Sequence, residues 1–161
     1  MKFLFFAATL VAATLAAHAQ TVEFYGSPTS PISAGAVVPA GKKLLWTSGI
    51  VADVADSTAA PTSRARYGDT KTQALSILKK LESALKPRGL SFRDVLMLRV
   101  YVTPDLEKGG KHDYQGWFDA YGQYFGTKQN PTKPTRSTLG LAGLVNPQLL
   151  IEIEMVAVYP D

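Results

Sequence analysis

Cysteine is absent from the sequence, and histidine occurs only twice. Without a thiol the chain can form no disulfide bond, no cysteine nucleophile and no thiolate metal site. His18 lies in a segment that we expect to be removed, so His112 is left alone and a zinc site with several histidines is excluded. Only a carboxylate metal site could then be built. His112 follows two glycines and a lysine, which predicts a solvated loop histidine.

Runs of positive charge are also missing. The formal net charge is +4, and no stretch of five consecutive Lys or Arg residues occurs. An excess this small and scattered is typical of a solvated surface, whereas nucleic-acid binding usually needs a basic stripe. We therefore expect no nucleic-acid partner.

Long apolar stretches are confined to the N-terminus. Lys2 precedes the apolar run 3–15, and the small-residue sequence Ala17-His18-Ala19 precedes Gln20. This order is typical of a secretory signal peptide, and the run is shorter than the about 20 apolar residues of a membrane-spanning helix. We expect a signal peptide at residues 1–19, a periplasmic or secreted mature protein, and no membrane contact after cleavage. An uncut N-terminal anchor is the alternative.

The 142 residues that follow suit a single domain. Residues 20–33 are rich in Ser, Pro and Thr and predict an N-terminal arm that docks on the domain, which then spans residues 34–161. Two short strand-like runs, Ala34–Val38 and Lys43–Ser48, flank Pro39-Ala40-Gly41 and predict a β-hairpin.

Hydrophobic spacing predicts two helices. In residues 69–86 apolar side chains recur three and four positions apart, Asp69 can cap the start, and Pro87 ends the helix. Residues 113–126 carry an aromatic stripe at the same spacing, made of Tyr114, Phe118, Tyr121 and Phe125. Such a stripe packs in a core far more often than it contacts a substrate, and we expect a core role.

The remaining apolar runs predict strands. Val95–Thr103 is rich in apolar and β-branched residues, which predicts a central strand covered on both faces. We expect its Arg99 to pair with a carboxylate or to lie at a contact between subunits. Leu149–Tyr159 alternates, so that Glu152 and Glu154 share one face of a strand. The order of elements predicts an α+β fold, a mixed sheet with both helices on one face.

Arg136 and Glu152 are the candidates for chemistry. Arg136 lies in the sequence Lys133-Pro134-Thr135-Arg136-Ser137-Thr138, and a guanidinium can grip a carboxylate through two parallel hydrogen bonds. If the strand after Arg136 pairs with the strand of Glu152, both could face one pocket, where the glutamate would activate a water molecule. The alternative, which spacing alone favours, is that they neutralise each other or that the glutamates form a solvated strand face.

The order of several short motifs resembles the RidA (YjgF) family over nearly the whole predicted domain. The most specific are Pro134-Thr135-Arg136-Ser137 and the closing strand Ile151-Glu152-Ile153-Glu154, followed by Ala157. Weaker matches are Ser48-Gly49, Gln73-Ala74-Leu75, Gly89, Asp94-Val95, Val100-Tyr101-Val102, Tyr121 and Tyr124-Phe125. With its predicted signal peptide, the chain looks like an exported RidA-like protein.

This resemblance implies a chorismate-mutase-like homotrimer with ligand pockets between subunits. It also implies hydrolysis of reactive enamines and imines to 2-keto acids and ammonia, without a metal or organic cofactor. By position, Arg136 would clamp the carboxylate of a small 2-imino or 2-keto acid, and Glu152 would hold the attacking water. Ser137, Thr138 and Ile50 would line the site.

Departures from the family pattern lead to a second hypothesis. Small residues occupy positions 34–36, where the family has a pocket tyrosine; Thr138 replaces a cysteine, and Ile50 replaces a glutamine. These changes alter the pocket and leave the arginine in place, which suits a non-catalytic binder of small carboxylates. Ribonuclease activity, sometimes attributed to the family, is disfavoured because no basic stripe with stacking aromatics is present.

Overall fold

The computed structural model describes residues 21–160, so the predicted signal peptide lies outside the described residues. This part of the chain forms the helices α1 (Thr70–Leu85) and α2 (Tyr114–Tyr121). The strands are β1 (Glu23–Tyr25), β2 (Gly35–Val37), β3 (Leu44–Trp46), β4 (Ile50–Val51), β5 (Val95–Val102), β6 (Pro104–Asp105), β7 (Lys111–His112), β8 (Thr135–Gly140) and β9 (Ile151–Val158). Short 3-10 turns are η1 (Arg64–Arg66), η2 (Lys86–Arg88), η3 (Phe92–Asp94) and η4 (Leu106–Lys108).

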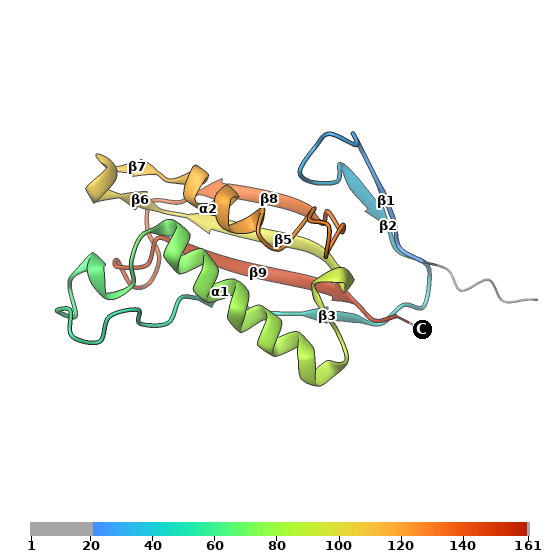
Figure 1. Ribbon diagram of the computed structural model, residues 1–161, viewed down its shortest axis with the longest axis horizontal. Coiled ribbons are helices and arrows are strands. Elements are labelled where there is room, and N and C mark those ends of the chain that lie inside the picture. Colours follow the sequence, from blue (N-terminus) through green and yellow to red (C-terminus); the bar gives the residue numbers. More distant parts are fainter. Residues whose placement is uncertain (1–20, 161) are drawn as a thin grey trace, which may run out of the picture.

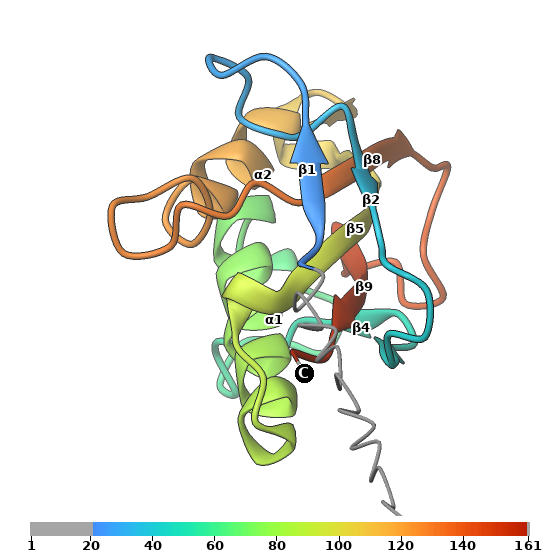
Figure 2. The same cartoon turned by 90° about the vertical axis from the view of Figure 1, so that its right-hand side faces the viewer.

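The main sheet has the strand order β3-β9-β5-β8, and β4 also pairs with β9. β5 runs parallel to β8 and antiparallel to β9, so the sheet is mixed. Both helices lie on one face of this sheet (Figures 1 and 2). The predicted α+β architecture is therefore confirmed. We call the opposite face, which neither α1 nor α2 covers, the open face.

α1 begins and ends close to the predicted residues. The Asp69 side chain accepts a hydrogen bond of 2.8 Å from a backbone N–H of the first turn and caps the helix. Gln73 is fully buried, and its amide hydrogen-bonds to the backbone of Gly68 and Leu150. The apolar stripe of the helix is buried in the core and comprises Ala74, Ile77, Leu78, Leu81 and Leu85.

Side chains along β5 alternate between the two faces of the sheet. The side chains beneath the helices are fully buried and comprise Leu98, Val100 and Val102. Those on the open face are partly exposed and comprise Met97, Arg99 and Tyr101. The expectation that both faces of this strand are covered is therefore wrong within one protomer. Arg99 donates a hydrogen bond of 2.6 Å to Glu154 on β9, which confirms the predicted carboxylate partner.

The N-terminal strands differ from the predicted hairpin. β2 pairs antiparallel with β1, which lies in the segment expected to form an arm. β3 pairs instead with β9, where Leu44 is opposite Val158. β9 is long enough to pair with β3 as well as with β5, so β3 belongs to the main sheet. The turn at residues 39–41 therefore connects two different sheets and does not form a β-hairpin. Figure 1 shows the β1–β2 pair standing beyond one end of the main sheet.

Candidate functional site

Arg136 lies on β8, an edge strand of the main sheet. In the register with β5 it is opposite Leu98, whose side chain is buried on the face that the helices cover. Arg136 therefore projects toward α2, and Thr138, two residues further along the strand, projects to the same face.

Three aromatic rings of α2 surround the Arg136 guanidinium. Its Cζ atom lies 4.5 Å from the ring centroid of Tyr121, 4.9 Å from that of Phe118 and 5.7 Å from that of Trp117. These distances lie within the range of cation–π attraction. Burial lowers the pKa of Arg136, although the neighbouring Tyr121 acts in the opposite direction. The ordinary arginine pKa is so high that the group still carries its charge.

No carboxylate of the described residues forms an ion pair with Arg136. Its Nη1 atom is buried and has no hydrogen-bond partner in this part of the chain. The same holds for Thr138 Oγ1 and for the indole Nε1 of Trp117, which belongs to the same layer between α2 and β8. Arg136 is half-buried, and partial burial of a guanidinium without a counter-charge is unfavourable for folding. Its presence here is therefore typical of a site that binds an anion.

A cavity of about 590 Å³ opens at Arg136. Phe118 and Tyr121 line it from α2, Lys133 from the loop before β8, and residues 29–31 from the N-terminal segment. Ligand-binding clefts commonly measure about 300 to 1,000 Å³. The cavity is thus large enough for a small organic acid with a side chain of considerable size.

Hydrogen bonds hold the N-terminal segment against this cavity. The Tyr121 hydroxyl donates to the Pro31 carbonyl at 3.0 Å, and Lys133 Nζ donates to the Pro28 carbonyl at 2.7 Å. The Ser33 hydroxyl donates to the Lys133 carbonyl at 2.6 Å. One wall of the cavity is therefore a loop whose position depends on a few polar contacts.

Glu152 faces away from this cavity. It lies on β9 opposite Tyr101, on the open face, and β5 separates β9 from β8. The strand of Arg136 therefore does not pair with the strand of Glu152, and the expectation that both face one pocket is wrong within a protomer. The alternative that the two side chains neutralise each other is wrong for the same reason.

The Glu152 carboxylate lies directly against Gly49. A Cβ atom at residue 49 would be only 1.7 Å from Glu152 Oε1, so this approach requires a glycine. Gly49 thus provides the space that the Glu152 carboxylate occupies on β9.

The other predicted site residues are dispersed. Ser137 is exposed on the open face, where it lies opposite Arg99. Ile50 lies opposite Ile153 and packs against the hydrophobic core. Of the predicted site residues, one protomer brings together only Arg136 and Thr138.

The helix predicted over residues 113–126 ends at Tyr121, so Phe125 lies beyond α2. The aromatic stripe is divided between the core and the cavity. Tyr121 and Phe125 are each 3% exposed and pack in the core, as predicted, but Phe118 is 39% exposed. The sequence did not predict that Phe118 lines a cavity, because helical spacing cannot show that an arginine from a distant strand lies beneath the stripe. Lys133 was missed as well, although its position three residues before Arg136 was a usable signal.

His112 is not the solvated loop residue that the sequence predicts. It lies on β7 and is half-buried, its Nε2 atom is 3.1 Å from the Leu141 carbonyl oxygen, and its ring stacks on Tyr114. Within residues 21–160, no group of His, Asp or Glu side chains is arranged to hold a metal ion. No helix of the same residues is long and apolar enough to cross a membrane.

Comparison with known proteins identifies the family. The family model described as endoribonuclease L-PSP matches residues 29–159, which is most of the chain. The chain belongs to the YjgF/YER057c/UK114 (Rid) family. Among solved structures, the fold of this Rid protein is similar to that of the Rid-family protein YyfB from Yersinia pestis, with 22% identity, a TM-score of 0.64, and coverage of 87% of this chain and 100% of that one.

Two Escherichia coli proteins of known structure have a higher sequence identity to this chain than YyfB has. TdcF, crystallised with bound serine, is 26% identical, with a TM-score of 0.56 and coverage of 81% of this chain and 95% of TdcF. The YjgF gene product is 27% identical, with a TM-score of 0.54 and coverage of 75% of this chain and 84% of that one. No curated protein matches the sequence.

Proposed function

We propose that this protein hydrolyses reactive 2-imino acids and their enamine tautomers to 2-keto acids and ammonia. The Rid family is associated with enamine and imine deamination. The observation that carries the proposal is the half-buried Arg136 side chain, which has no carboxylate partner among the described residues and borders a cavity of about 590 Å³. Bound serine in TdcF supports a site for a small carboxylate in this protein too.

The chemistry demands little of the protein. Arg136 would hold the substrate carboxylate through two parallel hydrogen bonds, so that the imine carbon lies in a fixed position. Water adds to this electrophilic carbon, the carbon–nitrogen bond then breaks, and the nitrogen leaves as ammonia after protonation. Positioning of substrate and water supplies most of the rate gain in such a reaction. We propose Glu152 as the group that binds and activates the water.

A homotrimer would reconcile the positions of these two groups. Arg136 and Glu152 lie on opposite faces of the sheet, so a shared pocket needs Arg136 from one protomer and Glu152 from the next. The open face also exposes apolar side chains near the sheet edges, among them Leu44, Trp46 and Leu139, which are 37%, 63% and 43% exposed. Apolar surface of this kind favours association between subunits. Light scattering of the purified mature protein should give the mass of three chains.

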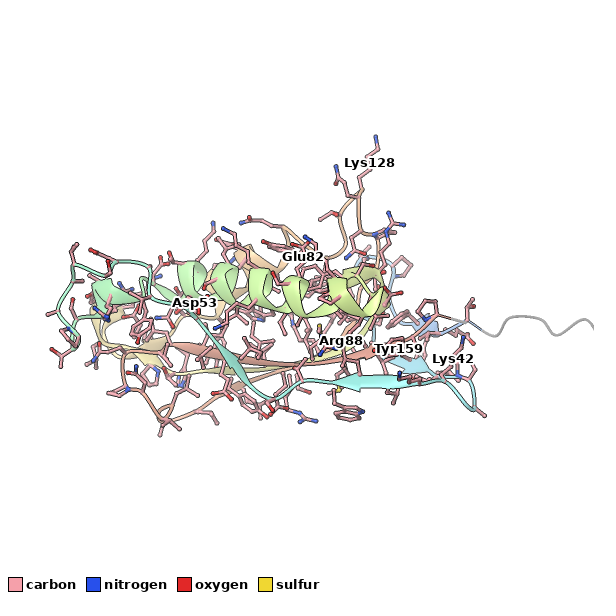
Figure 3. The ribbon with its side chains drawn as sticks, turned by 90° about the horizontal axis from the view of Figure 1, so that it is seen from below. Lys42, Asp53, Glu82, Arg88, Lys128 and Tyr159 are labelled. Atoms are coloured by element: carbon pink, nitrogen blue, oxygen red, sulfur yellow. The ribbon has the colours of Figure 1, made fainter. Side chains whose placement is uncertain are left out.

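Competition with semicarbazide tests the activity. An amino-acid oxidase generates a 2-imino acid in the presence of semicarbazide, and hydrolysis by the protein lowers the amount of semicarbazone formed. We expect Arg136→Ala to reduce the rate by at least about 100-fold, because the carboxylate clamp is lost. Arg88→Ala serves as the matched control, since Arg88 lies in the turn η2 that follows α1 (Figure 3) and donates to the Ala84 carbonyl. A wild-type rate no higher than that of Arg136→Ala would refute the proposal.

Non-catalytic binding of small carboxylates is the second candidate. It is favoured by Thr138, which stands where the family has a cysteine, and by the small residues at positions 34–36. This function predicts calorimetric binding of 2-keto acids that Arg136→Ala abolishes, with no effect of the protein on semicarbazone formation.

We also propose that the protein acts in the periplasm or outside the cell, because residues 1–19 have the pattern of a signal peptide. The mass of the protein recovered from a periplasmic fraction tests this proposal. A mature chain that begins at Gln20 would support export, and a chain that retains residues 1–19 would contradict it.

A further inference from the structure

Cationic and aromatic side chains lie next to one another in the lining of the cavity at Arg136. Arg136 and Lys133 place positive charge on one part of its lining, and neither forms an ion pair with a described residue. Phe118, Tyr121 and Phe125 supply an aromatic part. A ligand that matches this lining carries an anionic group and, next to it, an apolar group.

The size of the cavity exceeds what a two- or three-carbon side chain needs. At about 590 Å³, it lies in the range of clefts that hold ligands much larger than serine or alanine. The stacked rings of Tyr121 and Phe125, 5.0 Å apart between centroids with planes inclined by 20°, form a rigid floor. Both rings are nearly buried, so the floor is fixed by the core.

Phe118 is the exposed aromatic group of this cavity. Its side chain is 39% exposed although it lies on the stripe that packs into the core one turn later. The ring centroid is only 4.9 Å from the Arg136 guanidinium carbon. A carboxylate held by Arg136 therefore places the atoms attached to it beside this ring, where an aromatic ligand group could stack or pack edge-on.

We propose that the site selects 2-imino or 2-keto acids with an aromatic or bulky apolar side chain, and that Phe118 determines this preference. The inference rests on the carboxylate clamp of the proposed function, which it deepens by naming the substrate class. Burial of a ring against Phe118 adds apolar contact that a methyl side chain cannot make.

Calorimetry with stable 2-keto acids tests the preference separately from catalysis. Phenylpyruvate should bind the mature protein at least about ten-fold more tightly than pyruvate. Phe118→Ala should reduce this ratio to about two-fold or less. Phe118→Leu, which keeps an apolar side chain without a ring, should give an intermediate ratio. Tyr114→Ala is the matched control on the same helix and should leave the ratio unchanged.

The outcomes separate this inference from the proposed function. Equal affinity for phenylpyruvate and pyruvate would overturn the inference, even if small 2-imino acids are hydrolysed. A ratio that survives in Phe118→Ala would also overturn it, and so would an assembly that dissociates in this variant, since the ring would then serve contact between protomers. Tight, Phe118-dependent binding of phenylpyruvate without any hydrolysis would support the inference and refute catalysis.

Discussion

Arg136 and Glu152 lie on opposite faces of one sheet. The Arg136 side chain projects beneath α2 and contacts the rings of Tyr121 and Phe118, whereas Glu152 projects to the open face and lies against Gly49. A single protomer cannot bring a carboxylate clamp and a glutamate-bound water to the same substrate. The proposed reaction therefore requires that two protomers share each site.

Mixed oligomers should recover activity that each single variant lacks. Arg136→Ala and Glu152→Gln should each be inactive as homotrimers, but a mixture contains interfaces where an intact Arg136 meets an intact Glu152. In a trimer that contains both variants, one of the three interfaces is intact, so the doubly purified mixture should show about one third of the wild-type activity. Co-expression with two different affinity tags, tandem purification and the semicarbazone assay measure this recovery.

Two differently tagged copies of Arg136→Ala provide the control, which should stay inactive. If the mixed oligomers of the first experiment are also inactive although both tags co-purify, the two groups do not share a site between protomers.

The sequence predicted the helices, the long strands and the two candidate side chains, because these depend on local patterns. α1 is capped by Asp69, as its sequence indicates, and the alternation in β9 places Glu152 and Glu154 on one face, as predicted. Strand order is a different matter. That β5 would lie between β8 and β9 depends on which distant strands fit one another, and no local pattern encodes this choice.

The candidate site was predicted only in part, because it too depends on which distant segments come together. Arg136 was found through its motif, but the rings around it were assigned to the core, since a stripe at helical spacing looks the same whether it packs on leucines or on a guanidinium. The exposure of Phe118 and the nearby Lys133 became interpretable only when α2, β8 and the N-terminal segment were placed together.

Replacement of Gln73 should destabilise the fold although its side chain is uncharged. Its Nε2 atom donates to the carbonyls of Gly68 and Gln148 at 3.0 and 3.1 Å. Its Oε1 atom accepts from the Leu150 N–H at 2.8 Å. Gln73→Leu leaves these buried backbone groups unpaired and should lower the free energy of unfolding by about 2 to 4 kcal/mol. Urea denaturation followed by circular dichroism measures the change.

Gln115→Leu is the matched control for this experiment. Gln115 is exposed on α2 and hydrogen-bonds only to Asp119 among the described residues, so its replacement should change stability by less than about 0.5 kcal/mol. Equal effects of the two variants would show that the buried network at Gln73 contributes little.

The start of α2 should give the protein a measurable acid sensitivity. Burial alone would raise the pKa of Asp113, but hydrogen bonds from Lys108 and from the Gly116 N–H to the carboxylate outweigh it and lower the pKa. Because the folded pKa lies below the unfolded value, the contribution to stability is complete above the unfolded pKa of about 3.9. It is lost as the pH falls through the folded pKa.

Asp113→Asn isolates this contribution, since asparagine can still cap the helix but carries no charge for Lys108. At neutral pH the variant should be less stable by about 0.5 to 1 kcal/mol. The two unfolding curves, measured in urea from about pH 7 to pH 2, should converge at the acidic end, where both side chains are neutral. A difference that persists unchanged to about pH 2 would show that the charge of Asp113 is not its source.

Loss of the Tyr121 hydroxyl should make the N-terminal segment that lines the cavity more mobile and should weaken ligand binding. Burial raises the pKa of Tyr121 to about 12, with Arg136 acting in the opposite direction, so the phenol stays protonated at neutral pH and donates to the Pro31 carbonyl. Tyr121→Phe keeps the ring beside Arg136 and removes only this bond. Amide hydrogen exchange in residues 27–33 should become faster, and 2-keto acids should bind several-fold more weakly.

The pH dependence and a second variant distinguish this cause from a general loosening of α2. Because the hydroxyl does not ionise near neutral pH, the difference between Tyr121→Phe and wild type should stay constant from about pH 6 to pH 9. Tyr124→Phe, on the loop that follows the same helix, should leave exchange in residues 27–33 unchanged, since no hydrogen bond joins its hydroxyl to that segment in the described structure. Faster exchange in both variants would mean that packing of the rings, and not the bond to Pro31, holds the wall in place.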